Sequence, residues 1–129
     1  MNDTEKFSTK KRAKSFVYAF KGLAYIFKTQ HNFYIHLAIS ISVIFAAVIL
    51  KISQLEWLVI IGFMGLVLSA EAFNTAIEKM VDKLSPKKNR DAGIVKDVAA
   101  GAVLLASISA AVAGLIIFVP KIINTVLCL

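Results

Sequence analysis

The sequence predicts an all-α membrane protein with three transmembrane helices and one amphipathic surface helix. The first reason is composition, because 58% of the 129 residues are hydrophobic and only 18% are charged. A soluble domain of this size buries only about two-thirds of its surface, so its exposed surface would need more polar residues than this sequence supplies. The second reason is that the charges collect at the ends and connections, which leaves uncharged runs such as residues 98–119. As a helix that rises about 1.5 Å per residue, such a run crosses a hydrocarbon core of about 30 Å.

The first predicted element is a surface helix over about residues 13–28. Apolar side chains recur there at helical spacing, while Lys14 and Lys21 lie on the opposite side. The apolar side chains are Phe16, Phe20, Leu23 and Phe27. A helix with one apolar and one basic face lies in the plane of the membrane interface.

Three spans are predicted to follow, at about residues 33–50, 54–84 and 94–119. Ser53 and Glu56 have the spacing of a capping box, in which two side chains satisfy backbone amides at the start of a helix. Pro86 and Pro120 are predicted to end the second and third spans, because proline lacks the amide hydrogen that continues a helix.

The distribution of lysine and arginine predicts the orientation of these spans. Most cations lie before residue 29 or between residues 83 and 96, whereas Lys51 and Lys121 fall on the other side of the membrane. By the positive-inside rule, the amino terminus and the second loop are cytoplasmic and the carboxyl terminus is outside the cytoplasmic membrane. The net charge of +7 then reflects topology and attraction to anionic lipid, and no nucleic acid partner is expected.

A line of polar side chains on the second span is the most informative motif. Glu71, Asn74, Glu78 and Asp82 follow at spacings of three, four and four residues, so they share one helix face. An ionised carboxylate in a hydrocarbon setting costs about 2.5–3.5 kcal/mol, so such residues are kept for cation binding, proton transfer or pairing with bases. Carboxylates beside a basic loop suit Mg²⁺ and a phosphate donor, although a proton or cation transporter would use the same groups.

Small residues on the third span indicate self-association. They occur at every fourth position and let another helix backbone approach closely. These residues are Ala102, Ala106, Ala110 and Gly114. Three helices alone hardly enclose a polar site. We therefore expect a homo-oligomer, in which neighbouring subunits shield the polar line from lipid.

His36 is the titratable residue of the first span, and its position inside the cytoplasmic end of that span favours a structural role. The sequence contains no Cys and His metal quartet and no glycine-rich phosphate loop. The polar line on the second span is therefore the centre of any predicted chemistry.

Two longer motifs give a resemblance to a known family. The run Glu71-Ala-Phe-Asn74-Thr-Ala-Ile-Glu78-Lys-Met-Val-Asp82 resembles the signature of the bacterial integral-membrane diacylglycerol kinase and undecaprenol kinase family. The run Ala92-Gly-Ile-Val-Lys96-Asp97 resembles its second block, and the likeness extends from about Phe16 to Pro120. The resemblance implies one integral-membrane domain over residues 1–129 and a homotrimer with sites between subunits. It also implies transfer of the ATP γ-phosphate to a lipid alcohol with Mg²⁺.

The resemblance further implies roles for individual residues. Glu71 matches the general base that activates the lipid hydroxyl, with Asn74 beside it in the lipid site. Glu78 matches a magnesium ligand, but Gln30 stands where the family has a second glutamate ligand, and its neutral oxygen would bind Mg²⁺ less strongly. Trp57 fits the interfacial aromatic belt and is a further candidate for lipid contact. The positions that correspond to nucleotide contacts are Lys11, Tyr18, Gln30, Glu78, Lys87, Lys88, Asn89, Lys96 and Asp97.

We therefore predict a magnesium-dependent lipid kinase that gives undecaprenyl phosphate or phosphatidic acid from undecaprenol or diacylglycerol. The His36 region and the run Ala99-Ala-Gly-Ala-Val look closer to the undecaprenol kinase branch. One alternative is a family member whose catalysis is weakened by Gln30, and another is a small ion-conducting oligomer. A transporter would move its ion without ATP, whereas a weakened kinase should gain activity from Gln30→Glu.

Overall fold

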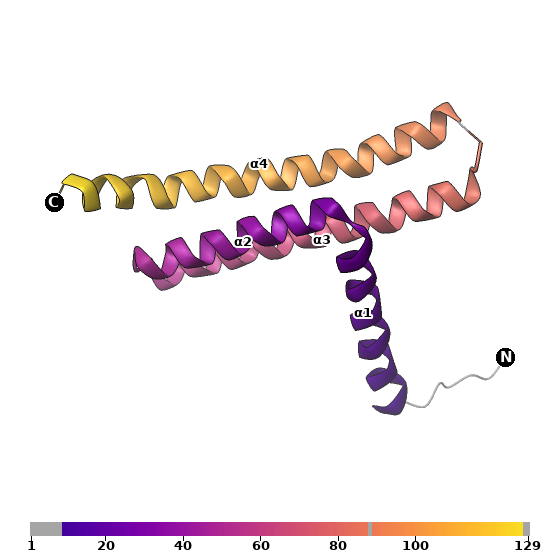
Figure 1. Cartoon of the computed structure of the whole chain (residues 1–129), viewed down its shortest axis with the longest axis horizontal. Coiled ribbons are helices and arrows are strands. Elements are labelled where there is room, and N and C mark those ends of the chain that lie inside the picture. Colours follow the sequence, from indigo (N-terminus) through magenta and orange to yellow (C-terminus); the bar gives the residue numbers. More distant parts are fainter. Residues whose placement is uncertain (1–8, 88, 128–129) are drawn as a thin grey trace.

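The computed structural model describes residues 9–87 and 89–127, and every regular element within these ranges is an α-helix. The helices are α1 (Thr9–Thr29), α2 (His31–Ile49), α3 (Gln54–Leu84) and α4 (Arg90–Leu127). The last three run lengthwise, with α3 packed against both α2 and α4, whereas α1 leaves the bundle at a steep angle (Figure 1). Each of α2, α3 and α4 is long and apolar enough to cross a membrane. The predicted all-α membrane fold is confirmed.

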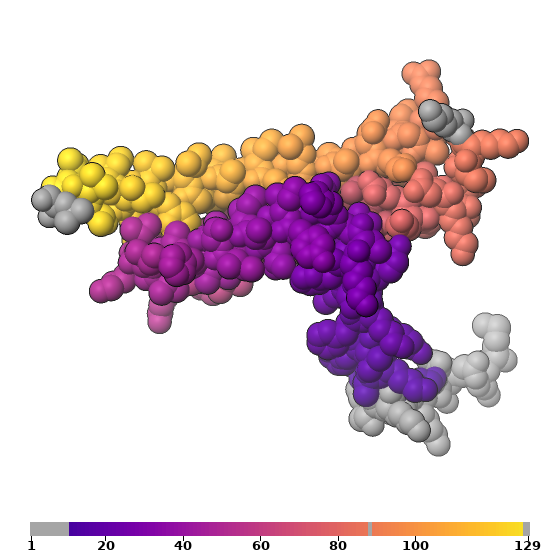
Figure 2. All heavy atoms as spheres, viewed as in Figure 1, coloured from indigo at the N-terminus to yellow at the C-terminus, as the bar shows by residue number. Residues whose placement is uncertain are grey.

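The surface helix α1 meets the bundle at its carboxyl-terminal end (Figure 1). Ile26 is buried there, and the ring of Phe27 packs edge-on against Phe33 of α2, with the ring centroids 5.0 Å apart. Phe16 and Phe20 are exposed on α1. The early part of this helix projects from the bundle (Figure 2). A helix set across the bundle axis with an uncovered apolar face is suited to the membrane interface.

The predicted capping box starts α3. The Glu56 amide donates to Ser53 Oγ at 3.3 Å, and the Ser53 amide donates to Glu56 Oε2 at 2.6 Å. At the other end, α3 stops at Leu84, and Pro86 follows one residue after the cap. Both limits of α3 agree with the local sequence signals.

The third span does not end at Pro120, which corrects the sequence prediction. Pro120 lies inside α4, and the helix continues to Leu127. Proline removes one backbone hydrogen bond from the helix, but a membrane helix tolerates this loss where neighbouring groups compensate. Lys121 Nζ lies 3.1 Å from Glu56 Oε2, which ties the segment after the proline to the start of α3.

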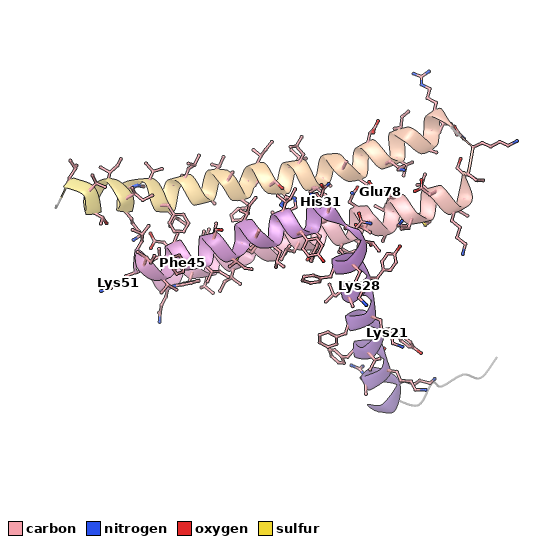
Figure 3. All side chains as sticks on the ribbon, viewed as in Figure 1. Lys21, Lys28, His31, Phe45, Lys51 and Glu78 are labelled. Atoms are coloured by element: carbon pink, nitrogen blue, oxygen red, sulfur yellow. The ribbon has the colours of Figure 1, made fainter. Side chains whose placement is uncertain are left out.

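Most large apolar side chains face outward. Phe45 and Ile116, for example, are exposed on α2 and α4. A small core forms near the α2–α3 turn from Ala47, Ile52, Ile60 and Ile117. Figure 3 places Phe45 and Lys51 at this end of the bundle and Glu78 toward the α3–α4 loop. The polar line and the apolar core therefore occupy different ends of α3.

Candidate active site

The polar line of α3 passes from buried to exposed side chains along the helix. Glu71, Asn74 and Thr75 are only 4%, 8% and 4% exposed, and they are the buried polar residues of the described chain. Glu78 is half-buried, and Asp82 is exposed near the end of the helix. The line therefore connects a buried carboxylate with the open loop between α3 and α4.

Glu71 is held by a residue from another helix. Its Oε1 lies 3.1 Å from Nε2 of His36 on α2, and the His36 side chain is 20% exposed. The ring nitrogen can carry a proton, whereas an ionised carboxylate oxygen can only accept one. The pair compensates part of the cost of placing a carboxylate among apolar helices.

Asn74 and Glu78 form the next pair along the line. Asn74 Nδ2 donates to Glu78 Oε1 at 3.3 Å, and Asn74 Oδ1 is buried without a hydrogen-bond partner within the described chain. A carboxylate and an unpaired amide oxygen are hard ligands of the kind that Mg²⁺ prefers. In residues 9–87 and 89–127, no group of three or more His, Cys, Asp and Glu side chains surrounds this point. The donor type thus fits a Mg²⁺ ion that takes its other ligands from phosphate and water.

A cavity of about 470 Å³ opens at the loop between α3 and α4. Lys96 and Asp82 both line it, and Lys96 Nζ lies 2.9 Å from Asp82 Oδ1. The other charged or amide residues that line it are Lys87, Asn89 and Arg90. The cavity therefore brings together three of the residues predicted to contact nucleotide, namely Lys87, Asn89 and Lys96.

An apolar groove of about 530 Å³ runs between α2, α3 and α4 on the other side of Glu71. His36 lines this groove and also contacts Glu71, so one side chain connects the groove with the buried carboxylate. Farther along, it is lined by residues such as Met64, Gly114 and Phe118. A groove of this composition suits a hydrocarbon chain.

The remaining predicted site residues of the described chain line neither the loop cavity nor the apolar groove. Tyr18 is exposed on α1 under the ammonium group of Lys21, and Lys11 lies one to two turns before it. Gln30 is half-buried at the junction of α1 and α2. Asp97 is exposed on α4, and Trp57 packs near the small core at the far end of α3. Lys88 lies outside the described residues.

Two features of the site were not predicted from the sequence. Arg90 lines the loop cavity, but it belongs to neither of the two motifs. His36, for which the sequence favoured a structural role, contacts Glu71 directly. The spacing from the α2–α3 turn would not have paired them, because His36 lies 13 residues before the end of α2 and Glu71 lies 17 residues after the start of α3.

This arrangement defines an integral membrane protein with a buried carboxylate and amide site that leads to a cation-rich loop. The chain belongs to the prokaryotic diacylglycerol kinase family, whose sequence profile matches residues 17–118. The predicted family resemblance is confirmed.

Two curated relatives carry different names. The chain is 38% identical over 108 residues to the undecaprenol kinase of Bacillus subtilis, which covers 84% of this chain and 88% of the relative. It is 40% identical over 111 residues to a diacylglycerol kinase of Synechocystis sp., which covers 85% of this chain but only 63% of the relative. Family and relatives support a lipid kinase, an enzyme class that uses a nucleotide co-substrate.

Proposed function

We propose that this protein transfers the γ-phosphate of ATP to the hydroxyl group of undecaprenol or diacylglycerol at the cytoplasmic membrane. The observation that carries the proposal is Glu71, a 4% exposed carboxylate on an apolar helix. It lies between an apolar groove and a line of oxygen ligands that ends at a cationic cavity. A lipid alcohol and a nucleotide would approach such a carboxylate from opposite sides.

In the proposed reaction, Glu71 takes the proton of the lipid hydroxyl. The alcohol oxygen then forms a bond to the γ-phosphorus, the bond from phosphorus to the β,γ-bridging oxygen breaks, and ADP leaves. Asn74 Oδ1, which has no partner within the described chain, is available to accept a hydrogen bond from the incoming hydroxyl or from a metal-bound water.

We assign Mg²⁺ binding to Glu78 and Gln30. A bound Mg²⁺ would neutralise charge on the phosphates during transfer. The Asn74 amide fixes one oxygen of the Glu78 carboxylate and leaves the other for the metal. Gln30 offers a carbonyl oxygen without charge, so phosphate oxygens and water would complete the coordination.

We assign nucleotide binding to the loop cavity and to the surface helix. Lys87, Asn89 and Lys96 line the cavity, and the motif adds Lys88 and Asp97. The family pattern assigns Lys11 and Tyr18 of α1 to the same nucleotide. These two residues lie on a helix that projects from the bundle (Figure 1), which supports a homotrimer in which subunits share a site.

Undecaprenol is the favoured acceptor of the two lipids. The relative named undecaprenol kinase is matched over 88% of its length, against 63% for the relative named diacylglycerol kinase. The groove is lined by apolar side chains from three helices, in keeping with a polyprenyl chain. Trp57 lies at the far end of α3 and would contact lipid at the outer part of the membrane.

We further propose that residues 1–129 act as one membrane domain with the α3–α4 loop in the cytoplasm. The cations of α1 and of this loop support that orientation, because Lys51 lies at the opposite end of the bundle (Figure 3). Lys121 pairs with Glu56 at the start of α3, at the same end.

Phosphate transfer from labelled ATP to undecaprenol and to diacylglycerol tests the function. The protein would be purified in detergent micelles and assayed across a magnesium titration, with Glu71→Gln as the control. Transfer that depends on Glu71 would support the proposal and identify the lipid. No transfer at any magnesium concentration would instead favour a weakened family member, and Gln30→Glu would be the next variant.

A further inference from the structure

His36 is a half-buried ionisable residue on the mostly apolar helix α2, and the proposed phosphate transfer gives it no role. It stands on α2, whereas Glu71, Asn74 and Glu78 stand on α3. Its Nε2 atom lies 3.1 Å from Glu71 Oε1, which is hydrogen-bonding distance. The contact is therefore the link between α2 and the polar line of α3.

The contact is specific, because Glu71 has no other polar partner in the described part of the chain. Asn74, one turn farther along the same helix, donates to Glu78 instead. The Glu71 side chain is 5% exposed, so water has little access to the carboxylate and could not easily take the place of His36 as its partner. Without His36, a buried carboxylate would have no donor to fix its rotamer.

The contact leaves one oxygen of Glu71 available. His36 engages Oε1, so Oε2 keeps its lone pairs for a substrate proton. A base that is oriented by a hydrogen bond from a third group is a recurrent arrangement in enzymes. His36 also lines the apolar groove, so it stands where a lipid chain would reach the carboxylate.

We propose that His36 is a positioning residue that holds Glu71 with Oε2 directed at the lipid hydroxyl. This role rests on the proposed function of Glu71 as the general base. The imidazole can donate from Nε2 in the neutral tautomer that carries its proton on Nε2, and also in the protonated form. The role therefore needs only the N–H group at Nε2.

The experiment compares four variants in the detergent assay: His36→Leu, His36→Gln, His36→Asn and Glu71→Gln. His36→Leu should lower kcat by about ten- to a hundredfold, the range found when groups that orient a ligand are removed. The KM for ATP should stay within about twofold, because His36 does not line the cavity proposed to bind the nucleotide. A glutamine amide reaches about as far as Nε2, whereas an asparagine amide is one methylene shorter. His36→Gln should therefore recover most of the rate and His36→Asn should not.

His31→Gln is the matched control, because His31 is the other histidine and is exposed at the start of α2. It should keep the wild-type kcat. The thermal midpoint of each variant separates loss of fold from loss of rate, and the two amide variants keep the comparison decisive if His36→Leu does not fold.

Equal rates for His36→Gln and His36→Asn would overturn the positioning role, as would a wild-type kcat for His36→Leu. If Glu71→Gln is inactive in the same assay, only the positioning role has failed. If Glu71→Gln is fully active, the base assignment itself is wrong and the role of His36 is lost with it.

Discussion

Lys96 Nζ lies 2.9 Å from Asp82 Oδ1, so the first turns of α4 are joined to the last turns of α3 across the loop cavity. Both side chains are accessible, at 37% exposed for Lys96 and 59% for Asp82. Exposed ion pairs contribute little to stability, because water screens them and ordering two side chains costs entropy. The pair is therefore better explained by the position that it gives to the lysine ammonium group than by stabilisation of the hairpin.

The first prediction concerns nucleotide affinity. Lys96→Met should raise the KM for ATP by about tenfold or more, because a charged donor to phosphate is lost. The thermal midpoint should move by only a few degrees. Both values can be measured with labelled ATP and with thermal unfolding in detergent.

Lys79→Met is the control for this prediction, since Lys79 is an exposed lysine on α3. It should leave the KM for ATP unchanged. An unchanged KM in Lys96→Met would remove the loop cavity from the nucleotide site.

The second prediction concerns the magnesium requirement. Gln30→Glu should lower the magnesium concentration that gives half-maximal activity, because a full negative charge replaces a neutral oxygen near the metal. Glu78→Gln should raise that concentration by about tenfold or more for the opposite reason. A magnesium titration at saturating ATP measures both shifts.

A carboxylate placed one residue away provides the control. His31→Glu adds the same charge at an exposed position next to Gln30. If His31→Glu lowers the requirement as much as Gln30→Glu, the effect is a general attraction of cations and Gln30 is not a ligand.

The sequence was sufficient for the helices and for the polar line, because their signals are local. Uncharged length predicts spans, the spacing of Ser53 and Glu56 predicts a cap, and the spacing of Glu71, Asn74 and Glu78 predicts one helix face. The structure adds that the first part of this face is buried and the last part is open.

Contacts between helices were harder to predict, because they depend on how two helices are rotated against each other. The distance from His36 to Glu71 is such a quantity, and so is the placement of Arg90 in the loop cavity. Pro120 failed as a stop signal for a related reason. A proline ends a helix in water, where the freed backbone groups can bind water. In hydrocarbon, ending the helix would leave still more backbone groups without hydrogen bonds, so the helix continues.

The third prediction concerns the groove. A Cβ atom at Gly114 would meet only the ring of Phe118, at 4.0 Å, which is an ordinary contact. Gly114→Ala should therefore keep wild-type activity, whereas the larger side chain of Gly114→Leu should fill part of the groove. We expect Gly114→Leu to raise the KM for a long polyprenol and to leave the KM for ATP unchanged.

A short-chain alcohol tests the same point without a new variant, because it needs less of the groove. Its KM should be similar in the wild type and in Gly114→Leu. If Gly114→Leu instead changes the oligomeric state in detergent, the groove is occupied by a second copy of the chain and the lipid lies elsewhere.

The fourth prediction concerns the end of the bundle opposite the site. Glu56 accepts from the Ser53 amide and pairs with Lys121, so it joins the start of α3 to the segment after Pro120. Ser53→Ala should lower the stability by about 1 kcal/mol, the usual effect of losing such a cap. Glu56→Ala should lower the thermal midpoint more than Glu56→Gln, because glutamine can still accept the hydrogen bond of the capping box.

None of these changes should alter kcat or KM at a temperature where the variant stays folded. Glu56 and Glu71 are separated by about 22 Å along α3, at about 1.5 Å per residue, and no polar chain joins them. Thermal unfolding and initial rates, measured on the same preparations, therefore separate the two ends of the helix. A lower kcat in Glu56→Ala with an unchanged midpoint would mean that the contact with Lys121 is transmitted along α3 or α4 to the candidate active site.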